Sequence, residues 1–331
     1  MSAGNNGLRN HGNTCYLNSA IQCLSHIDVL NNNNFKKQII KYKKKNSPLL
    51  NEWIDIQNKI WSSEYTDIIS LMNLINIFKQ KCISDGRFFE SFAQNDASEF
   101  LNHFLEFLHD DISHSVTMTI QGEKKNTLDK LYYNNLKSLE THFKKSYSYI
   151  VEQFYSSLLS LTQCPSCNKT TDNHEPISII TLTIMREFNS FYDCIDEYVK
   201  KISLDDDNKF KCEKCNEYVN IDKKTHFWDL PPILIFLIKK YDVNGVFDNS
   251  IQYPMKLDMN NYCLNYKENT MDYELRGLII HTGSLGGGHY TAICKNNIDN
   301  KWHKYDDANV SDIDEDNLFN INPYCLFYKR V

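Results

Sequence analysis

Hydrophobic residues near the start of the chain recur at helical spacing. Leu17, Ile21 and Leu24 fall at i, i+4 and i+7, which predicts a helix over residues 15–30. A second helix is predicted over residues 96–112, where the apolar stripe is more complete. The members of that stripe are Ala97, Phe100, Leu101, Phe104, Leu105 and Leu108. The first part of the chain is therefore predicted to be helical.

The second half of the chain has the pattern of β-strands. Residues 50–80 still carry weak helical periodicity, and the polar, Lys-rich residues 113–150 are predicted to be helix and loop. From about residue 176 onward, short apolar and β-branched runs predict strands. These runs are residues 177–184, 233–238, 275–281, 289–295, 301–305 and 324–329. Helices first and strands later favour an α+β fold over alternating βαβ units.

Composition and charge exclude several classes of protein. With 331 residues and 41% hydrophobic content, the chain can bury the core of one large domain or of two to three subdomains. A net charge of −6 disfavours nucleic-acid binding. The longest apolar run, residues 233–238, is too short to cross a bilayer, and the N-terminal residues do not resemble a signal peptide. Eleven cysteines without a secretory signal favour a reducing compartment, so we expect an intracellular protein, cytoplasmic or nuclear and not secreted.

Cys15 is the strongest candidate for a nucleophile. It would open the first predicted helix, where the helix dipole and unpaired backbone N–H groups lower a thiol pKa and raise the thiolate fraction. A buried, inert cysteine is the alternative for any single cysteine. The segment from Gly7 to Leu24 decides between them, because it closely resembles the cysteine box of the ubiquitin-specific proteases.

That resemblance implies the fold, the nucleophile and an oxyanion donor. It implies a papain-like α+β protease with a thumb (about 1–112), zinc-bearing β fingers (about 155–235) and a palm (about 113–154 plus 236–331). By resemblance Cys15 is the nucleophile and Asn10 helps to form the oxyanion hole. An amide N–H₂ is a neutral donor suited to a developing oxyanion. A turn-forming Asn before a glycine is the alternative for Asn10.

A predicted β-hairpin near the end of the chain supplies a base and a carboxylate. A turn centred on Asn297 and Ile298 would place His289 directly opposite Asp306 on one face of the hairpin. Asp307 would point to the other face, but a one-residue slip would exchange the two aspartates. The family's histidine box resembles these segments, which implies that His289 is the base and Asp306 its orienter, with Asp307 as the alternative.

Two C-x-x-C pairs predict a metal site. The four cysteines are Cys164, Cys167, Cys212 and Cys215. Four thiolates suit tetrahedral zinc, and the absence of a further ligand candidate nearby makes the ion structural. Unligated thiols in a reducing cell are the alternative. Many members of the family carry such pairs in the fingers, which supports one structural zinc ion.

Two further segments are candidates for substrate binding. Gln94, Asp96 and Glu99 lie in a segment that resembles a conserved box of the family, whose acidic residues meet arginines in the substrate tail. Asp96 and Glu99 also have the spacing of a capping box, so a structural role is equally open. The glycine-rich loop from Ser284 to Gly288 precedes the base and is expected to be flexible. By resemblance Gly287, Gly288 and Tyr290 line a narrow channel for a tail that ends in two glycines.

These features together predict a deubiquitinating thiol protease that acts as a monomer on ubiquitin and ubiquitinated proteins. An inactive ubiquitin-binding module, a zinc-dependent scaffold or nucleic-acid binder, and a protease for a ubiquitin-like modifier remain alternatives. Two charged runs, Lys41–Lys45 and Asp312–Asp316, are more typical of a solvated surface than of a binding patch.

Overall fold

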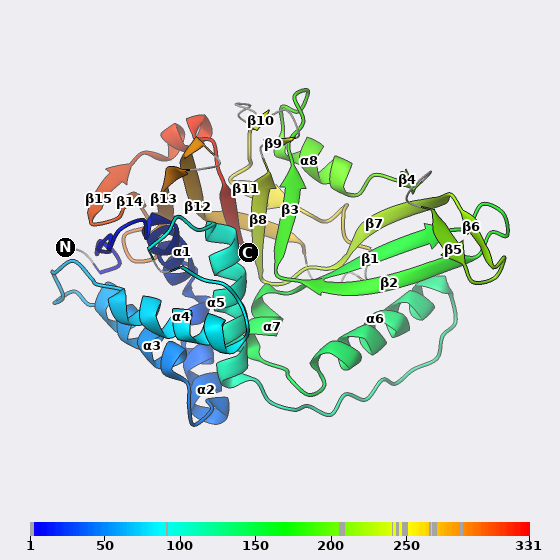
Figure 1. The fold of residues 1–331 in the computed structure, drawn as a ribbon, viewed down its shortest axis with the longest axis horizontal. Helices are drawn as coiled ribbons and strands as arrows, with labels where there is room; N and C mark the ends of the chain where they lie inside the picture. The colour runs from blue at the N-terminus through cyan, green and yellow to red at the C-terminus, as the bar shows by residue number, and fades with distance from the viewer. Residues whose placement is uncertain are drawn as a thin grey trace.

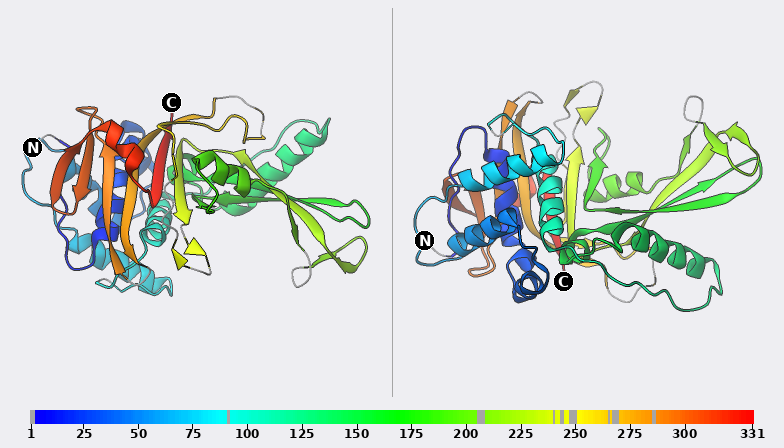
Figure 2. Two further views of the ribbon diagram at one scale, coloured as in Figure 1. Left: turned by 90° about the horizontal axis from the view of Figure 1, so that it is seen from above. Right: turned by 60° about the horizontal axis from the view of Figure 1, so that its bottom comes forward.

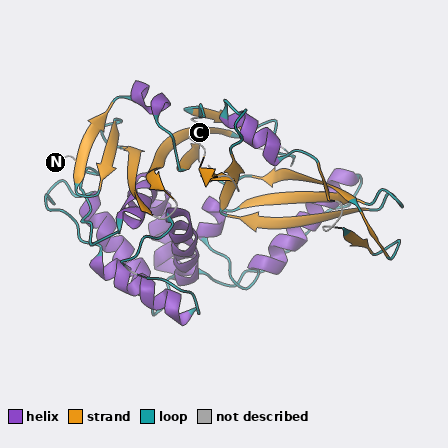
Figure 3. Cartoon of the chain, turned by 45° about the horizontal axis from the view of Figure 1, so that its top comes forward, coloured by secondary structure: helices purple, strands orange, loops and turns teal. Residues whose placement is uncertain are grey.

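The computed structural model describes residues 3–90, 92–204, 209–239, 241–242, 245–246, 251–264, 266, 270–284 and 287–331. The N-terminal helices gather on one side, a large sheet lies beside them, and a long β extension projects away from both (Figures 1 and 3). This is the predicted α+β class. Across the residues described, no helix is both long enough and apolar enough to traverse a bilayer.

Helices α1 to α5 form the helical side of the molecule (blue to cyan in Figure 1). Their bounds, with the 3₁₀ helix η1, are α1 Cys15–His26, η1 Asp28–Leu30, α2 Asn33–Tyr42, α3 Pro48–Ile60, α4 Met72–Ser84 and α5 Ala97–Ile112. Every residue of α1 is buried, because the helix packs between α5 and strands of the main sheet. The site at its N-terminus therefore lies between helices and sheet.

The main sheet has the strand order β15-β14-β13-β12-β16-β8-β3, and β11 pairs with β12 beside this path. Its pairs are antiparallel except for β3 with β8. The bounds are β3 Ile179–Thr183, β8 Ile233–Lys239, β11 Lys256–Asp258, β12 Asp272–Ser284, β13 Gly287–Lys295, β14 Trp302–Asp306, β15 Asn309–Ile313 and β16 Cys325–Arg330. Strand β16 thus lies inside the sheet, between β12 and β8.

The projecting extension is a second sheet with the order β2-β1-β7-β4, continued at its tip by the hairpin β5-β6 (Figure 2). The bounds are β1 Ser156–Gln163, β2 Thr170–Ile177, β4 Ile202–Leu204, β5 Phe210–Cys212, β6 Glu217–Val219 and β7 Ile221–Asp229. Helix α6 (Thr127–Phe143) lies along β2, where Ser138 Oγ donates to the backbone oxygen of His174 over 2.7 Å. The remaining elements are α7 Tyr149–Phe154, α8 Phe191–Tyr198, β9 Tyr241–Asp242, β10 Gly245–Val246 and η3 Glu315–Asn320.

Both faces of the main sheet are buried at its centre, along β16 and β8. Along β16, Cys325 and Phe327 join the core shared with the helices, while Leu326 and Tyr328 join a second core on the opposite face with α8. Strand β8 divides its side chains in the same way. Two-sided burial explains why residues 233–238 are continuously apolar instead of alternating with polar residues.

The structure corrects several predicted boundaries. Helix α1 ends at His26 and not at residue 30, because Ile27 leaves helical geometry and the chain continues as η1. The single strand predicted over residues 177–184 is the end of β2 followed by β3, which lie in different sheets. Strands β1 and β7 were not predicted, because their half-exposed faces lack a regular alternation of apolar and polar residues.

Candidate active site and cysteine cluster

Cys15 is the first residue of α1, as predicted, and Asn10 shapes the loop before it. The side-chain oxygen of Asn10 accepts from the backbone N–H groups of Gly12 and Thr14, at 2.9 and 3.3 Å. These contacts fix which end of the amide is the donor. The N–H₂ end of Asn10 therefore points away from the loop.

The Cys15 thiol lies against the strand that follows the predicted base. Cys15 is only 5% exposed, and the backbone N–H of Tyr290 lies near enough to its sulfur to lower the pKa of the thiol. Burial raises the pKa of the Cys15 thiol; the Tyr290 N–H acts in the opposite direction, and the charge of Asp307 adds to the increase. The lowered pKa that the helix N-terminus predicts is therefore not found in this state, because loss of solvation outweighs the dipole. The contact does bring the front and the back of the chain together.

His289 and Asp306 form the predicted pair. His289 Nε2 donates to Asp306 Oδ1 over 2.7 Å, and the two side chains are 45% and 42% exposed. This bond holds the ring and leaves Nδ1 as the nitrogen that can accept a proton. A carboxylate that orients an imidazole is the arrangement used by thiol and serine proteases.

The hairpin register differs from the prediction by two residues. Ala292 lies opposite Tyr305, and pairing of β13 with β14 stops there, so His289 is not directly opposite Asp306. Side chains alternate with a period of two, so a shift by two keeps each of them on its face. Asp306 therefore still reaches His289, along a diagonal.

Asp307 contacts the other half of the site. Its carboxylate accepts from Asn10 Nδ2 at 2.8 Å and from Asn18 Nδ2 at 2.7 Å. Its backbone oxygen accepts from the N–H of Leu8 at 2.8 Å, and its φ of 52° is in the left-handed region. The two neighbouring aspartates therefore have different roles: Asp306 orients the imidazole of His289, and Asp307 holds the loop that carries Asn10.

The segment before α5 combines a structural cap with one contact to the glycine strand. Asp96 is the N-cap of α5 and accepts from the N–H groups of Ser98 and Glu99. Its second oxygen accepts from the hydroxyl of Tyr324. The Glu99 side chain is 64% exposed. Gln94 Oε1 accepts from the backbone N–H of Gly288 at 2.8 Å, which places Gln94 beside the base.

The expected glycine loop is largely paired strand. Gly288 lies opposite Gly283 and Gly287 opposite Ser284 in the β12–β13 ladder, while Leu285 and Gly286 lie outside the described residues. A Cβ at Gly288 would come within 2.3 Å of the His281 ring and 2.7 Å of the Thr282 carbonyl oxygen, so only glycine fits there.

Tyr290 has a fixed position beside this strand. It is 9% exposed, and its ring lies 4.4 Å from that of His281 and 5.4 Å from that of Tyr324, measured between centroids. These contacts hold the backbone of β13 where it meets Cys15.

The four predicted metal ligands meet at the tip of the extension. All four sulfurs lie within 4.8 Å of one another, with Cys164 to Cys215 at 3.8 Å and Cys167 to Cys212 at 3.7 Å. Tetrahedral zinc with bonds of about 2.3 Å requires sulfurs about 3.8 Å apart. Backbone N–H groups of Cys215 and Lys214 lower the pKa of Cys212 to about 6. The cluster therefore has the composition and spacing to bind a metal ion.

Comparison with known proteins identifies the family. The model of the ubiquitin carboxyl-terminal hydrolase family matches residues 6–328. The chain belongs to this family. Usp2 of Drosophila melanogaster is 29% identical over 343 residues, which cover 100% of this chain and 35% of Usp2. A probable ubiquitin carboxyl-terminal hydrolase of Acanthamoeba polyphaga mimivirus is 27% identical over 99% of this chain and 90% of its own length.

A solved structure with a similar fold supports the predicted fold class of this family member. Ubp8 in the SAGA module with Sgf11, Sus1 and Sgf73, bound to monoubiquitin, matches with a TM-score of 0.76 and 24% identity, covering 99% of this chain and 70% of that one. The predicted papain-like α+β fold is confirmed. The chain spans about half of human ubiquitin carboxyl-terminal hydrolase 2, at 54% of its length.

One contributor to the site was not predicted from the sequence. Asn18 lies one turn after Cys15 on α1, is 3% exposed and donates to Asp307. Asn18 is one of several polar residues in a helix that is buried along its whole length. A buried polar side chain needs a partner, and this need was the available signal.

Proposed function

We propose that the chain is a cysteine-type deubiquitinase that hydrolyses the bond after the C-terminal glycine of ubiquitin. One observation carries the proposal: Cys15 begins the helix that packs on β13 and lies beside the backbone N–H of Tyr290, and the preceding residue, His289, is held by Asp306. A thiol and an oriented imidazole at one cleft are the parts that nucleophilic acyl transfer requires.

The residues have separate roles in the proposed reaction. His289 removes the proton from the Cys15 thiol, and the sulfur attacks the carbonyl carbon of the terminal glycine of ubiquitin. The Asn10 N–H₂ group, oriented by Asp307, donates to the oxyanion that develops. His289 then protonates the departing lysine amine, and a thioester to Cys15 remains. Water, deprotonated by His289, hydrolyses the thioester and restores the thiol.

The substrate tail is proposed to run along β13 toward Cys15. Because Gly287 and Gly288 have no side chains, the backbone of the tail can come close to the backbone of β13. A path this narrow would admit a tail of glycines, and Tyr290 would line it. Glu99 presents an exposed carboxylate for an arginine of the tail, for which a charge-assisted hydrogen bond is suited. Asp96 and Gln94 would act mainly by holding Tyr324 and Gly288 in place.

We infer that the cysteine cluster holds one structural zinc ion, which would fix the tip of the extension against the rest of the second sheet. The division into thumb (1–112), fingers (155–235) and palm (113–154 plus 236–331) is part of the proposal. We also propose that the protein acts as a monomer and does not bind nucleic acid. Ubp8, in contrast, was solved within a multi-subunit module. Light scattering tests the monomer, and metal analysis of the purified protein tests the zinc.

The decisive experiment uses ubiquitin with a C-terminal electrophile. We expect the wild-type protein to form a covalent adduct and Cys15→Ala to form none, while both still bind unmodified ubiquitin. Parallel probes built on ubiquitin-like modifiers test the substrate. If a probe built on a ubiquitin-like modifier labels the protein and the ubiquitin probe does not, the assignment moves to that modifier. Binding of ubiquitin without labelling by any probe would favour an inactive binding module.

A further inference from the structure

Residues 92–96 (the bridging segment) directly precede α5 and contact both halves of the proposed active site. The first contact is with the loop before α1. Asn13, two residues before Cys15, donates its side-chain N–H to the backbone oxygen of Phe92 over 2.9 Å. Its φ of 54° lies in the left-handed region, which asparagine tolerates. The bridging segment is therefore tied to the loop that leads into the nucleophile.

Asn95 ties the bridging segment to the residue that follows Cys15. Its Nδ2 donates to the hydroxyl of Tyr16 over 3.2 Å, and Tyr16 is only 1% exposed. The same N–H₂ group also has the backbone oxygens of Glu90 and Ala93 as acceptors, at 2.9 and 3.1 Å. Asn95 thus fixes the path of the bridging segment as well as its contact with α1.

The bridging segment also contacts strand β13, which carries the proposed base. Gln94 Oε1 accepts from the backbone N–H of Gly288 at 2.8 Å. A second contact passes through an aromatic ring. Asp96 accepts from the hydroxyl of Tyr324, and the centroid of the Tyr324 ring lies 5.4 Å from that of Tyr290. One short segment therefore joins the residues around Cys15 to the strand of the base.

The first part of β13 has little other support on this edge. Its pairing with β14 covers only residues 292–295, so among the described strands residues 287–291 pair only with β12. Gly287 and Gly288 have no side chains with which to pack. Gln94 gives Gly288 the hydrogen-bond acceptor that a neighbouring strand would otherwise supply. The position of His289 therefore depends on where the bridging segment lies.

We propose that Asn13 and Asn95 are positioning residues, which hold the bridging segment so that it sets the separation of Cys15 and His289. This inference rests on the proposed function, because it assigns those two residues as nucleophile and base. They lie on different elements, and no hydrogen bond among the described residues joins the sulfur to the imidazole. A misplacement of about 1 Å can cost about 10²-fold in rate, so a segment that fixes their separation has a large effect.

Amide hydrogen exchange tests the proposal without substrate. Asn95→Leu keeps the approximate size of the side chain and removes the N–H₂ group, which does not itself bond to Gly288. If the bridging segment positions β13, the backbone amide of Gly288 should still exchange about tenfold faster in this variant than in the wild type, as measured by NMR. Gln94→Met removes the acceptor directly and should give a comparable increase.

Hydrolysis of ubiquitin with a C-terminal fluorophore tests the consequence for the reaction. Asn95→Leu and Gln94→Met should each lower kcat about 10- to 100-fold and change KM by less than about twofold. Asn13→Gly keeps the left-handed backbone and should act in the same direction. The double variant Gln94→Met/Asn95→Leu should lose no more than the larger single loss, because both changes break the same connection. Gln94→Glu keeps an oxygen for the Gly288 N–H and should retain most of the activity.

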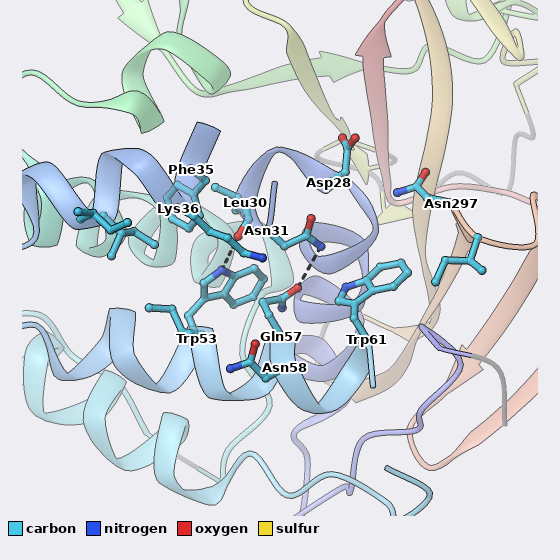
Figure 4. A pocket seen from close by; sticks show the side chains of 14 residues that line it. Asp28, Leu30, Asn31, Phe35, Lys36, Trp53, Gln57, Asn58, Trp61 and Asn297 are labelled. Atoms are coloured by element: carbon cyan, nitrogen blue, oxygen red, sulfur yellow. Dashed lines mark hydrogen bonds between the residues drawn. The ribbon is translucent and has the colours of Figure 1, made fainter. Parts of the chain in front are cut away.

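Asn31→Leu is the matched control. Asn31 is half-buried like Asn95, and its N–H₂ group donates to the backbone oxygen of Ser25 at 3.1 Å and to Gln57 Oε1 at 3.5 Å (Figure 4). It lies beyond the far end of α1, which has 12 residues and is about 18 Å long. This variant should lower the melting temperature about as much as Asn95→Leu does, but it should leave kcat and the amide exchange unchanged.

Three results would overturn the proposal. The first is unchanged exchange at Gly288 in Asn95→Leu, whatever the activity of that variant. The second is a loss of kcat that multiplies in the double variant, because the two residues then act independently. The third is a rise in KM at unchanged kcat, which would make these residues substrate contacts. If the wild type itself hydrolyses no ubiquitin, the proposed function fails, and the exchange measurement still decides whether the bridging segment positions β13.

Discussion

The contact between Asp307 and Asn10 makes a sharp prediction about the oxyanion donor. Asp307→Asn keeps the size of the side chain and tolerates the left-handed φ of 52°. It replaces one of the two accepting oxygens by an N–H₂ group. The buried Asn18 will keep the remaining oxygen, because an unsatisfied buried amide is costly. The new N–H₂ group will therefore face the Asn10 N–H₂ group and displace it.

The size of the effect follows from the role proposed for Asn10. Loss of one oxyanion donor lowers kcat by about 10²- to 10³-fold. We expect Asp307→Asn and Asn10→Ala each to produce a loss of this order in the hydrolysis of ubiquitin with a C-terminal fluorophore, with little change in KM. Because both changes remove the same donor, the double variant should lose no more than either single variant.

Two outcomes separate this explanation from others. If the losses multiply, to about 10⁴-fold or more, the two residues act independently and the positioning role of Asp307 is refuted. Asn18→Ala is the matched control, because it removes the other partner of Asp307 and leaves the contact with Asn10. It should reduce thermal stability more than activity.

Three further predictions concern the base, the thiol and the cysteine cluster. Asp306→Ala removes the acceptor of the His289 N–H and should lower kcat/KM about 10- to 100-fold. The reason is that a charge-assisted hydrogen bond between half-exposed groups contributes about 1.4–2.7 kcal/mol. An unchanged kcat/KM would exclude Asp306 as the residue that orients His289. Burial raises the pKa of the Cys15 thiol in the free protein. The rate of iodoacetamide alkylation at Cys15, which follows the thiolate fraction, should therefore rise at a higher pH than the rate for a free cysteine in the same assay. A midpoint below that of the free cysteine would contradict this. Cys212→Ser, or removal of zinc by a chelator, should lower the melting temperature and raise KM for ubiquitin while kcat changes less; a metal-free protein with wild-type stability would exclude a structural ion.

The sequence was most informative where residue type and local periodicity decide the structure. The start of α1 at Cys15, the stripe of α5 and the two cysteine pairs are all local patterns, and each is found as predicted. The pairing of His289 with Asp306 was also predicted, since a two-residue error in register preserves the face of a strand.

Interactions that cross the fold were not accessible in this way. The link from Asp307 to Asn18, and the one from Gln94 to Gly288, join residues far apart in the chain that only the packed structure brings together. The thiol pKa depends on how deeply the packed fold buries Cys15 and not only on the position of Cys15 in its helix. Helix α6, which was predicted only as helix and loop, gains its place from contacts with β2.

The interior position of β16 has a consequence for how the protein is made. Its six residues separate β12 from β8, so two sections of the main sheet cannot be joined until residues 325–330 have been synthesised. At ordinary translation rates this leaves apolar strand edges unpaired for on the order of ten seconds. A nascent chain that lacks residues 325–330 therefore exposes these strand edges, and it depends on protection from aggregation until β16 has been synthesised.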